Sequence, residues 1–108
     1  MSRPLPRTAK GDSASARLAR SLARHAVLDC LAAAVLAVGD LERVRIVQML
    51  VFVASAPDFG EQSLVADAAS ELLIEVLGEN GRHARTAIGV AGLPLDSPVE
   101  IQMVCTAV

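Results

Sequence analysis

Val44-Arg-Ile-Val-Gln-Met-Leu-Val-Phe-Val53 is the stretch that decides the fold, because apolar side chains occupy nearly every position. A short, almost continuous apolar run is typical of a β-strand that is covered on both faces. Ala56-Pro57-Asp58 then ends the run, since proline cannot donate a backbone hydrogen bond to a neighbouring strand. We therefore expect a central strand over residues 44–53.

Helical patterns flank this strand on both sides. The first helix begins near Asp12 or Ser13, either of which can cap free backbone N–H groups, and ends at Gly39, which suits a left-handed C′ position. The second helix covers residues 61–77 and ends at Gly78. The expected buried stripe of the first helix is Leu18, Leu22, His25, Leu28, Val35 and Val38, with His25 as a packed or interfacial histidine. Its separate basic stripe is Arg17, Arg20 and Arg24, for which a solvated face is the commoner explanation and an anion site the alternative.

Two further strands are expected at residues 85–91 and 99–106, with a proline-containing turn over residues 93–98 between them. The order helix, strand, helix, strand, strand predicts an α+β fold with two helices packed on one face of a mixed sheet. Residues 1–12 show no periodicity, so we expect a flexible lead-in followed by one domain over residues 13–108.

Three strands form a narrow sheet for two helices of this length. The open sheet edges and the second sheet face would need a partner. The composition points the same way, because 53% of the 108 residues are hydrophobic, which is much for so small a domain. We therefore expect an oligomer.

Composition and charge exclude several classes of function. A formal net charge of -2, with two Phe and neither Tyr nor Trp, argues against a nucleic-acid binder. A membrane span is not expected, because no uninterrupted apolar run approaches the roughly 20 residues that a spanning helix needs. The N-terminus lacks the apolar core of a signal peptide, which favours the cytoplasm; a transit peptide is the less favoured alternative.

Motifs for metals and cofactors are absent from the sequence. We find no phosphate-binding Gly-rich loop, no His/Cys cluster and no nucleophile elbow, so we expect neither a metal nor a cofactor. Cys30 and Cys105 lie far apart and have no metal-ligand or disulfide pattern. Both are expected to be small buried residues in a reducing compartment.

Arg85 and Glu100 are the residues that could carry chemistry. If the last two strands pair as a symmetric hairpin, positions that sum to 185 face each other, which places Arg85 opposite Glu100. An arginine fork binds a carboxylate bidentately, and a neighbouring carboxylate can orient that fork or polarise a water molecule. Such a pair could bind a small 2-keto or 2-imino acid. The alternative is a cross-strand or inter-subunit salt bridge.

Several segments, in this order and spacing, resemble the RidA/YjgF family. They are Val51-Phe-Val-Ala-Ser-Ala-Pro-Asp-Phe59, Ala69-Ser-Glu-Leu-Leu73, Gly81-Arg-His-Ala-Arg-Thr-Ala-Ile-Gly-Val-Ala91 and Leu93-Pro94. The resemblance covers about residues 14–108, is most specific over residues 81–94, and is closest to the subgroup with a longer helix-to-strand loop.

The resemblance implies a chorismate-mutase-like fold, a homotrimer with active sites between subunits, and hydrolysis of reactive enamine/imine intermediates such as 2-aminoacrylate to 2-keto acids and ammonia. No cofactor is implied. Arg85 matches the family arginine that clamps the substrate carboxylate, and Glu100 matches the acidic residue near the attacking water. The backbone at Thr86 and Ala87 would line the pocket.

The sequence also departs from the family pattern. Members normally begin with a strand hairpin, and here a short lead-in takes its place, which predicts a narrower sheet and a more open cleft; a start codon further upstream is the other explanation. Asp67 stands where the family commonly has Asn, and a negative charge near the pocket would repel a substrate carboxylate by about 1 kcal/mol or more. Ala87 stands where many members have Cys, although the close subgroup also carries Ala.

These departures leave three hypotheses for function. The first is an imine deaminase of the family type. The second is a divergent member that binds or transforms a carboxylate-bearing metabolite in a biosynthetic pathway. The third is a non-catalytic remnant that retains only the ability to assemble.

Overall fold

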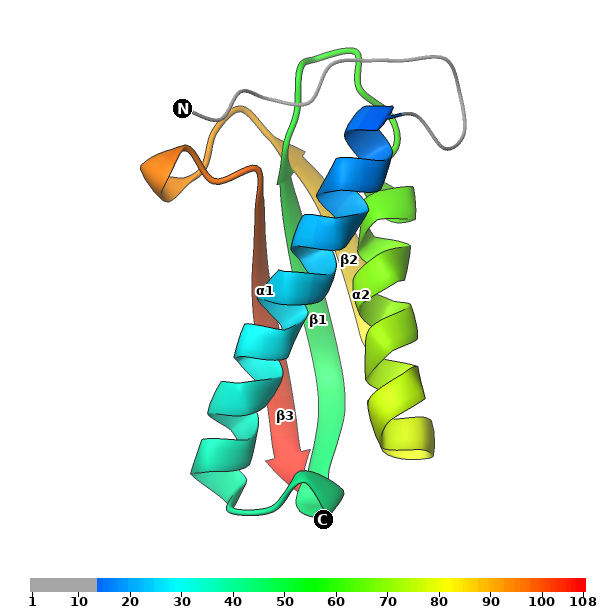
Figure 1. Cartoon of the computed structure of the whole chain (residues 1–108), viewed down its shortest axis with the longest axis vertical. Coiled ribbons are helices and arrows are strands. Elements are labelled where there is room, and N and C mark those ends of the chain that lie inside the picture. Colours follow the sequence, from blue (N-terminus) through cyan, green and yellow to red (C-terminus); the bar gives the residue numbers. More distant parts are fainter. Residues whose placement is uncertain (1–13) are drawn as a thin grey trace.

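The structure is a computed structural model that describes residues 14–108. Two helices, α1 (Ala14–Val38) and α2 (Gln62–Leu77), lie side by side over one face of a sheet (Figure 1). The sheet contains β1 (Val44–Ala54), β2 (Ala84–Val90) and β3 (Val99–Ala107). The predicted α+β architecture and its element order are confirmed. The expected lead-in over residues 1–12 lies outside the described residues.

The helix ends follow the residues that mark them in the sequence. Gly39 has a φ of 99° and donates its N–H to the Val35 carbonyl at 2.6 Å, as expected for a left-handed C′ residue. Gly78 also has a positive φ, of 61°, and its N–H bonds to the Ile74 carbonyl. A short 3₁₀ turn over Gly78–Gly81 then leads into β2.

The strand order is β2-β1-β3, so the expected hairpin between the last two strands is wrong. β1 pairs with β2 in parallel and with β3 antiparallel, which makes the sheet mixed, as expected. The parallel pair is the physical consequence of α2, which forms the crossover between β1 and β2. The connection from β2 to β3 then passes over the end of β1, where Ala54 N–H bonds to the Pro98 carbonyl and Ser55 N–H to the Val90 carbonyl.

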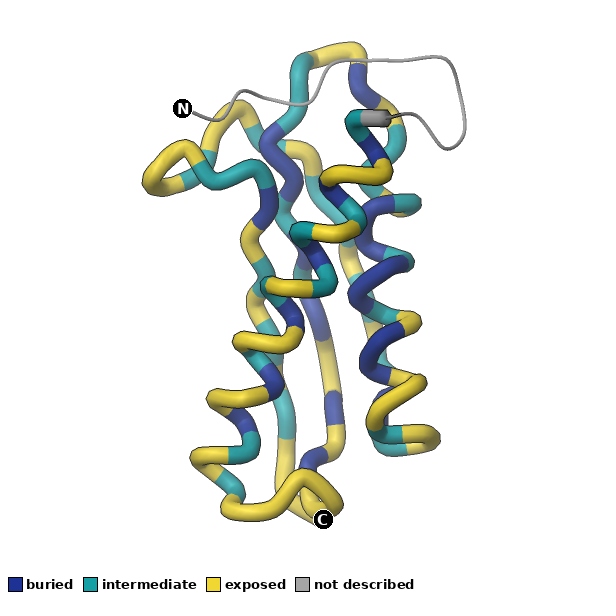
Figure 2. Tube along the Cα trace, in the orientation of Figure 1, coloured by how far each residue is buried: buried dark blue, intermediate teal, exposed yellow. Residues whose placement is uncertain are grey.

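β1 is covered on one face only, which corrects the expectation of two covered faces. Val44, Ile46, Met49, Val51 and Val53 are buried in the core between the sheet and the helices. Alternate positions point to the other face, where nothing in the described chain covers them. Figure 2 shows this alternation of buried and exposed positions along β1. The second face of the sheet is therefore left open by residues 14–108.

The buried stripe of α1 is made of small residues and differs from the expected one. Its buried residues are Ala16, Ala19, Ala23, Val27, Leu31 and Ala34. Leu18 and Leu28, which the leucine periodicity placed inside, are 61% and 45% exposed, and His25 is exposed as well. Alanine at the contact lets α1 approach α2 and the sheet closely, so the helix turns its alanines inward and leaves these leucines outside.

The basic stripe of α1 bridges the two helices. Arg20 donates to the Leu64 carbonyl at 2.5 Å and pairs with Glu71 at 3.4 Å, and Arg24 pairs with Glu75 at 3.7 Å. These contacts hold α1 against α2. Two members of the stripe therefore have carboxylate partners on α2.

By length and composition, Ser15–Val38 could cross a membrane, although no uninterrupted apolar run reaches that length. In this fold the segment is the core helix α1, and its alanine stripe packs into the core cluster. Leu18, Leu28 and Leu36 stay exposed, so packing inside the described domain covers only part of the apolar surface of α1. The cytoplasmic location stays a prediction.

Candidate functional site

Arg85 lies near the start of β2, with its side chain on the helix-covered face of the sheet. Its Nη1 donates to Asp67 Oδ1 at 2.6 Å, and Ser70 Oγ lies 3.4 Å from the same nitrogen. Asp67 and Ser70 are three residues apart on α2, so they occupy one face of that helix. Arg85 and Asp67 side chains are 25% and 45% exposed, so the pair borders solvent.

Only one nitrogen of the guanidinium makes a hydrogen bond within the described residues. Nη1 holds both contacts, and neither Nε nor Nη2 has a partner in residues 14–108. The Nε–Nη2 edge is one of the two faces with which arginine binds a carboxylate bidentately. Arg85 is thus fixed at one corner and open along one edge.

A histidine completes the cluster on the other side of Ser70. His83 Nε2 lies 3.0 Å from Ser70 Oγ, and His83 Nδ1 lies 2.5 Å from the Gly81 carbonyl oxygen. A carbonyl can only accept, so Nδ1 carries the hydrogen and Nε2 of the neutral ring accepts from the Ser70 hydroxyl. The hydrogen bonds therefore run in one direction, from Arg85 to Ser70 to His83 to Gly81.

These side chains line a hollow of about 230 Å³ between α2 and the start of β2. Its walls are Ser70, Ile74, Arg82, His83 and Arg85. Arg82 is held by Glu79 at 3.0 Å, at an exposed position. Two cationic groups at one small hollow suit a small anion, and Ile74 supplies an apolar wall.

Gly81 fixes the position of this cluster. A Cβ at Gly81 would lie 2.2 Å from the backbone oxygen of Leu73 and 2.6 Å from its carbonyl carbon, so no other residue fits without moving the backbone. The close approach sets where β2 starts relative to α2. It also sets the carbonyl that orients His83.

Glu100 does not meet Arg85 within the chain. Arg85 pairs with Met49, while Glu100 pairs with Phe52, three residues further along β1. Side chains three residues apart on a strand point to opposite faces, and the strands of Arg85 and Glu100 are the two outer ones. Glu100 therefore lies exposed on the open face, about 10 Å further along the strands. The alignment that placed the two residues opposite each other is corrected by the strand order.

The other expected site residues divide between the two faces. Ala87 pairs with the buried Val51 and packs against the core, and Thr86 pairs with Leu50 and is exposed on the open face. Neither residue lines the hollow at Arg85. Asp67 is brought into direct contact with Arg85.

Ser70 and His83 are the site residues that the sequence reasoning did not single out. They are 13 residues apart and come from different elements, so spacing alone does not join them. Two signals were present in the sequence. His83 lies two residues before Arg85, and Ser70 follows Asp67 by one helical turn.

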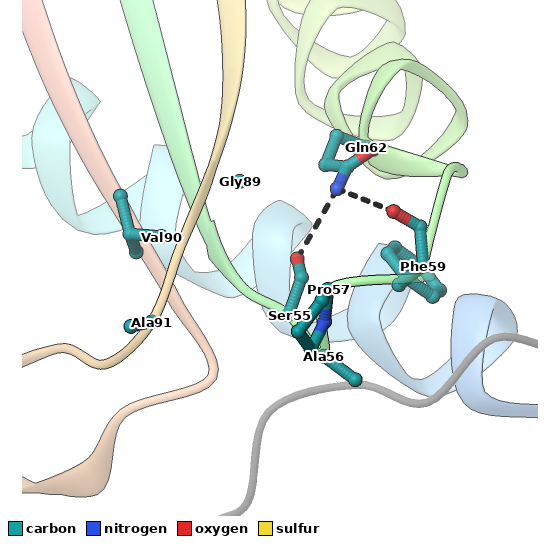
Figure 3. A pocket seen from close by; sticks show the side chains of 8 residues that line it. All are labelled: Ser55, Ala56, Pro57, Phe59, Gln62, Gly89, Val90 and Ala91. Atoms are coloured by element: carbon teal, nitrogen blue, oxygen red, sulfur yellow. Dashed lines mark hydrogen bonds between the residues drawn. The ribbon is translucent and has the colours of Figure 1, made fainter.

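A second, larger cavity of about 630 Å³ lies at the carboxyl ends of β1 and β2 (Figure 3). Gln62 Nε2 donates to the Phe59 carbonyl at 2.9 Å and to Ser55 Oγ at 3.4 Å, as the dashed lines show. Gly89, the β2 residue nearest to Arg85 in its lining, is four residues away, about 13 Å along the strand. A small molecule held by Arg85 cannot reach this cavity.

Metal and thiol chemistry find little support in residues 14–108. No group of three or more His, Cys, Asp or Glu side chains there could hold a metal ion. Burial raises the pKa of the Cys30 thiol above its ordinary value, and the charge of Asp29 adds to the rise. A raised pKa disfavours the reactive thiolate.

The fold and the site together define an α+β domain with a small arginine-lined hollow between a helix and an edge strand. The family described as Endoribonuclease L-PSP matches residues 6–107, and the chain belongs to this family, also known as RidA/YjgF.

Individual relatives support this assignment. The chain is 46% identical over 93 residues to Protein TCP17 of Trypanosoma cruzi, a match that covers 84% of this chain and 58% of that protein. The crystal structure of Atu1372 from Agrobacterium tumefaciens, a protein of unknown function, superposes with a TM-score of 0.83 at 38% identity, over 94% of this chain and 66% of that one. A putative endoribonuclease from Shewanella oneidensis gives a TM-score of 0.80 at 25% identity, over 94% and 65% of the two chains. The chain thus spans somewhat less than two thirds of its relatives' length.

Proposed function

We propose that the chain is a hydrolytic deaminase of the RidA type, which converts small imines or enamines of 2-amino acids, such as 2-aminoacrylate, to 2-keto acids and ammonia. Membership of the family supports the general class. The observation that carries the proposal is the open Nε–Nη2 edge of Arg85. Asp67 fixes the same guanidinium through its hydrogen bond with Nη1. Such an edge fits the one group that all these substrates share, the carboxylate next to C2.

The reaction needs few protein groups. A carboxylate on Arg85 fixes C2 of the substrate at the hollow, where water adds to the carbon–nitrogen double bond. The carbinolamine then collapses, the carbon–nitrogen bond breaks and ammonia leaves. Arg85 contributes binding and orientation, which converts the attack of water into a step within a bound pair.

Assembly as a homotrimer is part of this proposal. The open sheet face carries Leu50, Phe52, Thr86, Ile88, Glu100 and Val104. Val104 is 44% exposed, and both outer strands leave a free edge. An apolar sheet face with two free edges favours association with copies of the same chain. Glu100 would then act at the Arg85 of a neighbouring subunit.

Mixed assemblies test this arrangement. Arg85→Ala and Glu100→Gln subunits, each expected to be inactive alone, are co-expressed with different affinity tags and purified as hetero-oligomers. A site made of Arg85 from one subunit and Glu100 from another regains activity in the mixture. A mixture as inactive as its two parents contradicts a shared site.

One observation favours a second candidate function. The Asp67 carboxylate already partners Arg85, which weakens the attraction for a substrate carboxylate. This favours a protein that binds a carboxylate-bearing metabolite weakly without turning it over. Titration with 2-ketobutyrate, followed by amide NMR shifts at β2, separates the two: binding without turnover of the imine supports the second function. The slightly acidic chain gives no reason to extend the endoribonuclease description to it.

A further inference from the structure

We propose that Ser70 and His83 form a proton relay that serves the water attacking a substrate held on Arg85; this inference rests on the proposed deaminase function. The relay supplies the proton acceptor that Glu100 cannot supply within one chain, because Glu100 lies on the opposite face of the sheet. Among the described residues, no carboxylate lines the hollow at Arg85, and His83 is the one titratable base there.

The direction of the hydrogen bonds carries the argument. Arg85 Nη1 points a donor at Ser70 Oγ, Ser70 donates to Nε2 of His83, and Nδ1–H of His83 donates to the Gly81 carbonyl. Ser70 Oγ is therefore set to accept a proton from the site side and to pass its own hydroxyl proton to Nε2 of His83. The second lone pair of Ser70 Oγ remains able to accept from a water molecule in the hollow.

A hydrogen bond at Nδ1 fixes the orientation of the His83 ring, so that Nε2 faces Ser70 as a base. The Gly81 carbonyl holds the Nδ1–H tautomer, and Gly81 itself is fixed by its contact with the Leu73 backbone. A nucleophile or water activated through a hydroxyl, a base and an orienting group is the general logic of acid–base catalysis in triads. Ser70 and His83 are partly buried and both line the hollow.

The proton balance of the step closes without an additional reactant. As water adds to C2 of the protonated imine, the oxygen–carbon bond forms and the electron pair of the double bond moves to nitrogen. One water proton passes to Ser70 Oγ while the hydroxyl proton of Ser70 passes to His83 Nε2. The proton then returns by the same path to the amine nitrogen, the carbon–nitrogen bond breaks, and the remaining hydroxyl proton leaves with ammonia as ammonium. The keto acid remains and His83 is neutral again.

The charged groups that face His83 are the two arginines of the hollow, Arg82 and Arg85, with their respective partners Glu79 and Asp67. Each arginine has its own carboxylate. The relay requires a basic Nε2 on His83 as the acceptor of the Ser70 proton, which predicts that kcat falls on the acid side of the profile.

The test compares variants that keep or remove the basic nitrogen. His83→Gln can still accept a hydrogen bond from Ser70 through its amide oxygen but cannot take a proton. Steady-state hydrolysis of 2-iminobutyrate, generated in situ by a dehydratase, is measured from pH 5.5 to 8.5. We expect kcat to drop about 100-fold or more with KM within threefold, and the acid limb of the profile to vanish. His25→Gln is the matched control, since His25 is the other histidine and is exposed on α1, bonded to the Ser21 carbonyl.

Other outcomes are distinct. If His83→Gln keeps both kcat and the acid limb, the histidine has a structural role only and the relay is wrong. If His83→Gln fails to fold, Ser70→Ala tests the relay instead. We expect kcat to fall in Ser70→Ala and to recover in Ser70→Thr, which keeps a hydroxyl; an unchanged kcat in Ser70→Ala would show that the relay is wrong. If the folded wild-type protein hydrolyses no imine at all, the proposed function fails and the relay with it, which is recognisable because the wild type itself is inactive.

Discussion

Asp67 Oδ1 accepts a hydrogen bond from Arg85 Nη1 at 2.6 Å, and this contact joins α2 to β2 at the mouth of the polar hollow. The pair has two opposing effects on a carboxylate ligand. Asp67 holds Nη1 of the guanidinium and leaves the Nε–Nη2 edge without a partner in residues 14–108, and its negative charge repels the ligand. The affinity of the site depends on which effect is larger.

Asp67→Asn separates these effects, because the amide oxygen can still accept from Nη1 while the charge is removed. We expect the KM for 2-iminobutyrate to fall about fivefold with kcat little changed, corresponding to about 1 kcal/mol of repulsion at a partly exposed site. Glu71→Gln is the control, since it removes the same charge from α2 at the Arg20 contact. A KM that rises in Asp67→Asn would show that the ionised carboxylate is needed to hold Arg85.

Gly81 should tolerate no side chain. Alanine at this position would force its Cβ against the Leu73 backbone, and backbone atoms cannot rotate away as the end of a side chain can. We expect Gly81→Ala to lower the free energy of unfolding by about 3 kcal/mol, measured by urea denaturation. Gly60→Ala is the matched control, because a Cβ there meets nothing within 4 Å. Equal stability of the two variants would contradict the packing described for β2.

The open sheet face should govern assembly. Val104→Lys places a charge on that face, where the side chain is already 44% exposed in the single chain, so folding of the subunit is preserved. We expect this change to dissociate the proposed trimer, as measured by size-exclusion chromatography with light scattering. Leu36→Lys on α1, at a position 87% exposed, should leave the mass unchanged. If Leu36→Lys dissociates the protein and Val104→Lys does not, the helices form the interface in place of the sheet.

The Cys30 thiol should ionise only at high pH. Burial raises its pKa, the Asp29 carboxylate adds to the rise, and the Sγ donates to the Ile101 carbonyl at 3.6 Å. In a Cys105→Ala background, the pH midpoint for reaction with a disulfide reagent should lie above that of the urea-unfolded chain. Asp29→Asn should lower the midpoint, and Glu42→Gln should not change it. Equal midpoints in the folded and unfolded chains would contradict this environment.

The raised pKa of Cys30 also determines how the free energy of unfolding changes with pH. The folded thiol keeps its proton to a higher pH than the unfolded thiol does. Its contribution to the free energy of unfolding is therefore complete below the ordinary thiol pKa of about 8.5, and is lost as the pH rises from there through the raised pKa. Cys30→Ser should remove this alkaline dependence.

Local signals in the sequence were sufficient for the elements of the fold. Gly39 and Gly78 end the two helices as expected, Gly39 with the expected positive φ, and the apolar run at residues 44–53 became the central strand. Hydrophobicity alone could not predict which face of α1 is buried. Leucine is more hydrophobic than alanine, but close packing of helices selects the smaller side chain. Ala19 and Ala23 are therefore inside and Leu18 is outside.

The site was only partly predictable, because strand order is a property of the whole chain. A short connection between residues 90 and 99 suggested a hairpin, but the crossover through α2 places β2 beside β1, and the remaining free edge of β1 is the one that β3 takes. That arrangement separates Arg85 from Glu100 and joins Arg85 to Asp67 and Ser70 instead. His83 joins the cluster only once Ser70 is placed opposite it.

The most direct test of the account is ammonia release from 2-iminobutyrate, generated in situ by a dehydratase, with wild-type protein, Arg85→Ala and Arg85→Lys. The account predicts that wild type accelerates the release, that Arg85→Ala abolishes the acceleration, and that Arg85→Lys restores little of it, since lysine has no bidentate fork. Acceleration that persists in a folded Arg85→Ala protein would contradict the role of Arg85 and the site built around it.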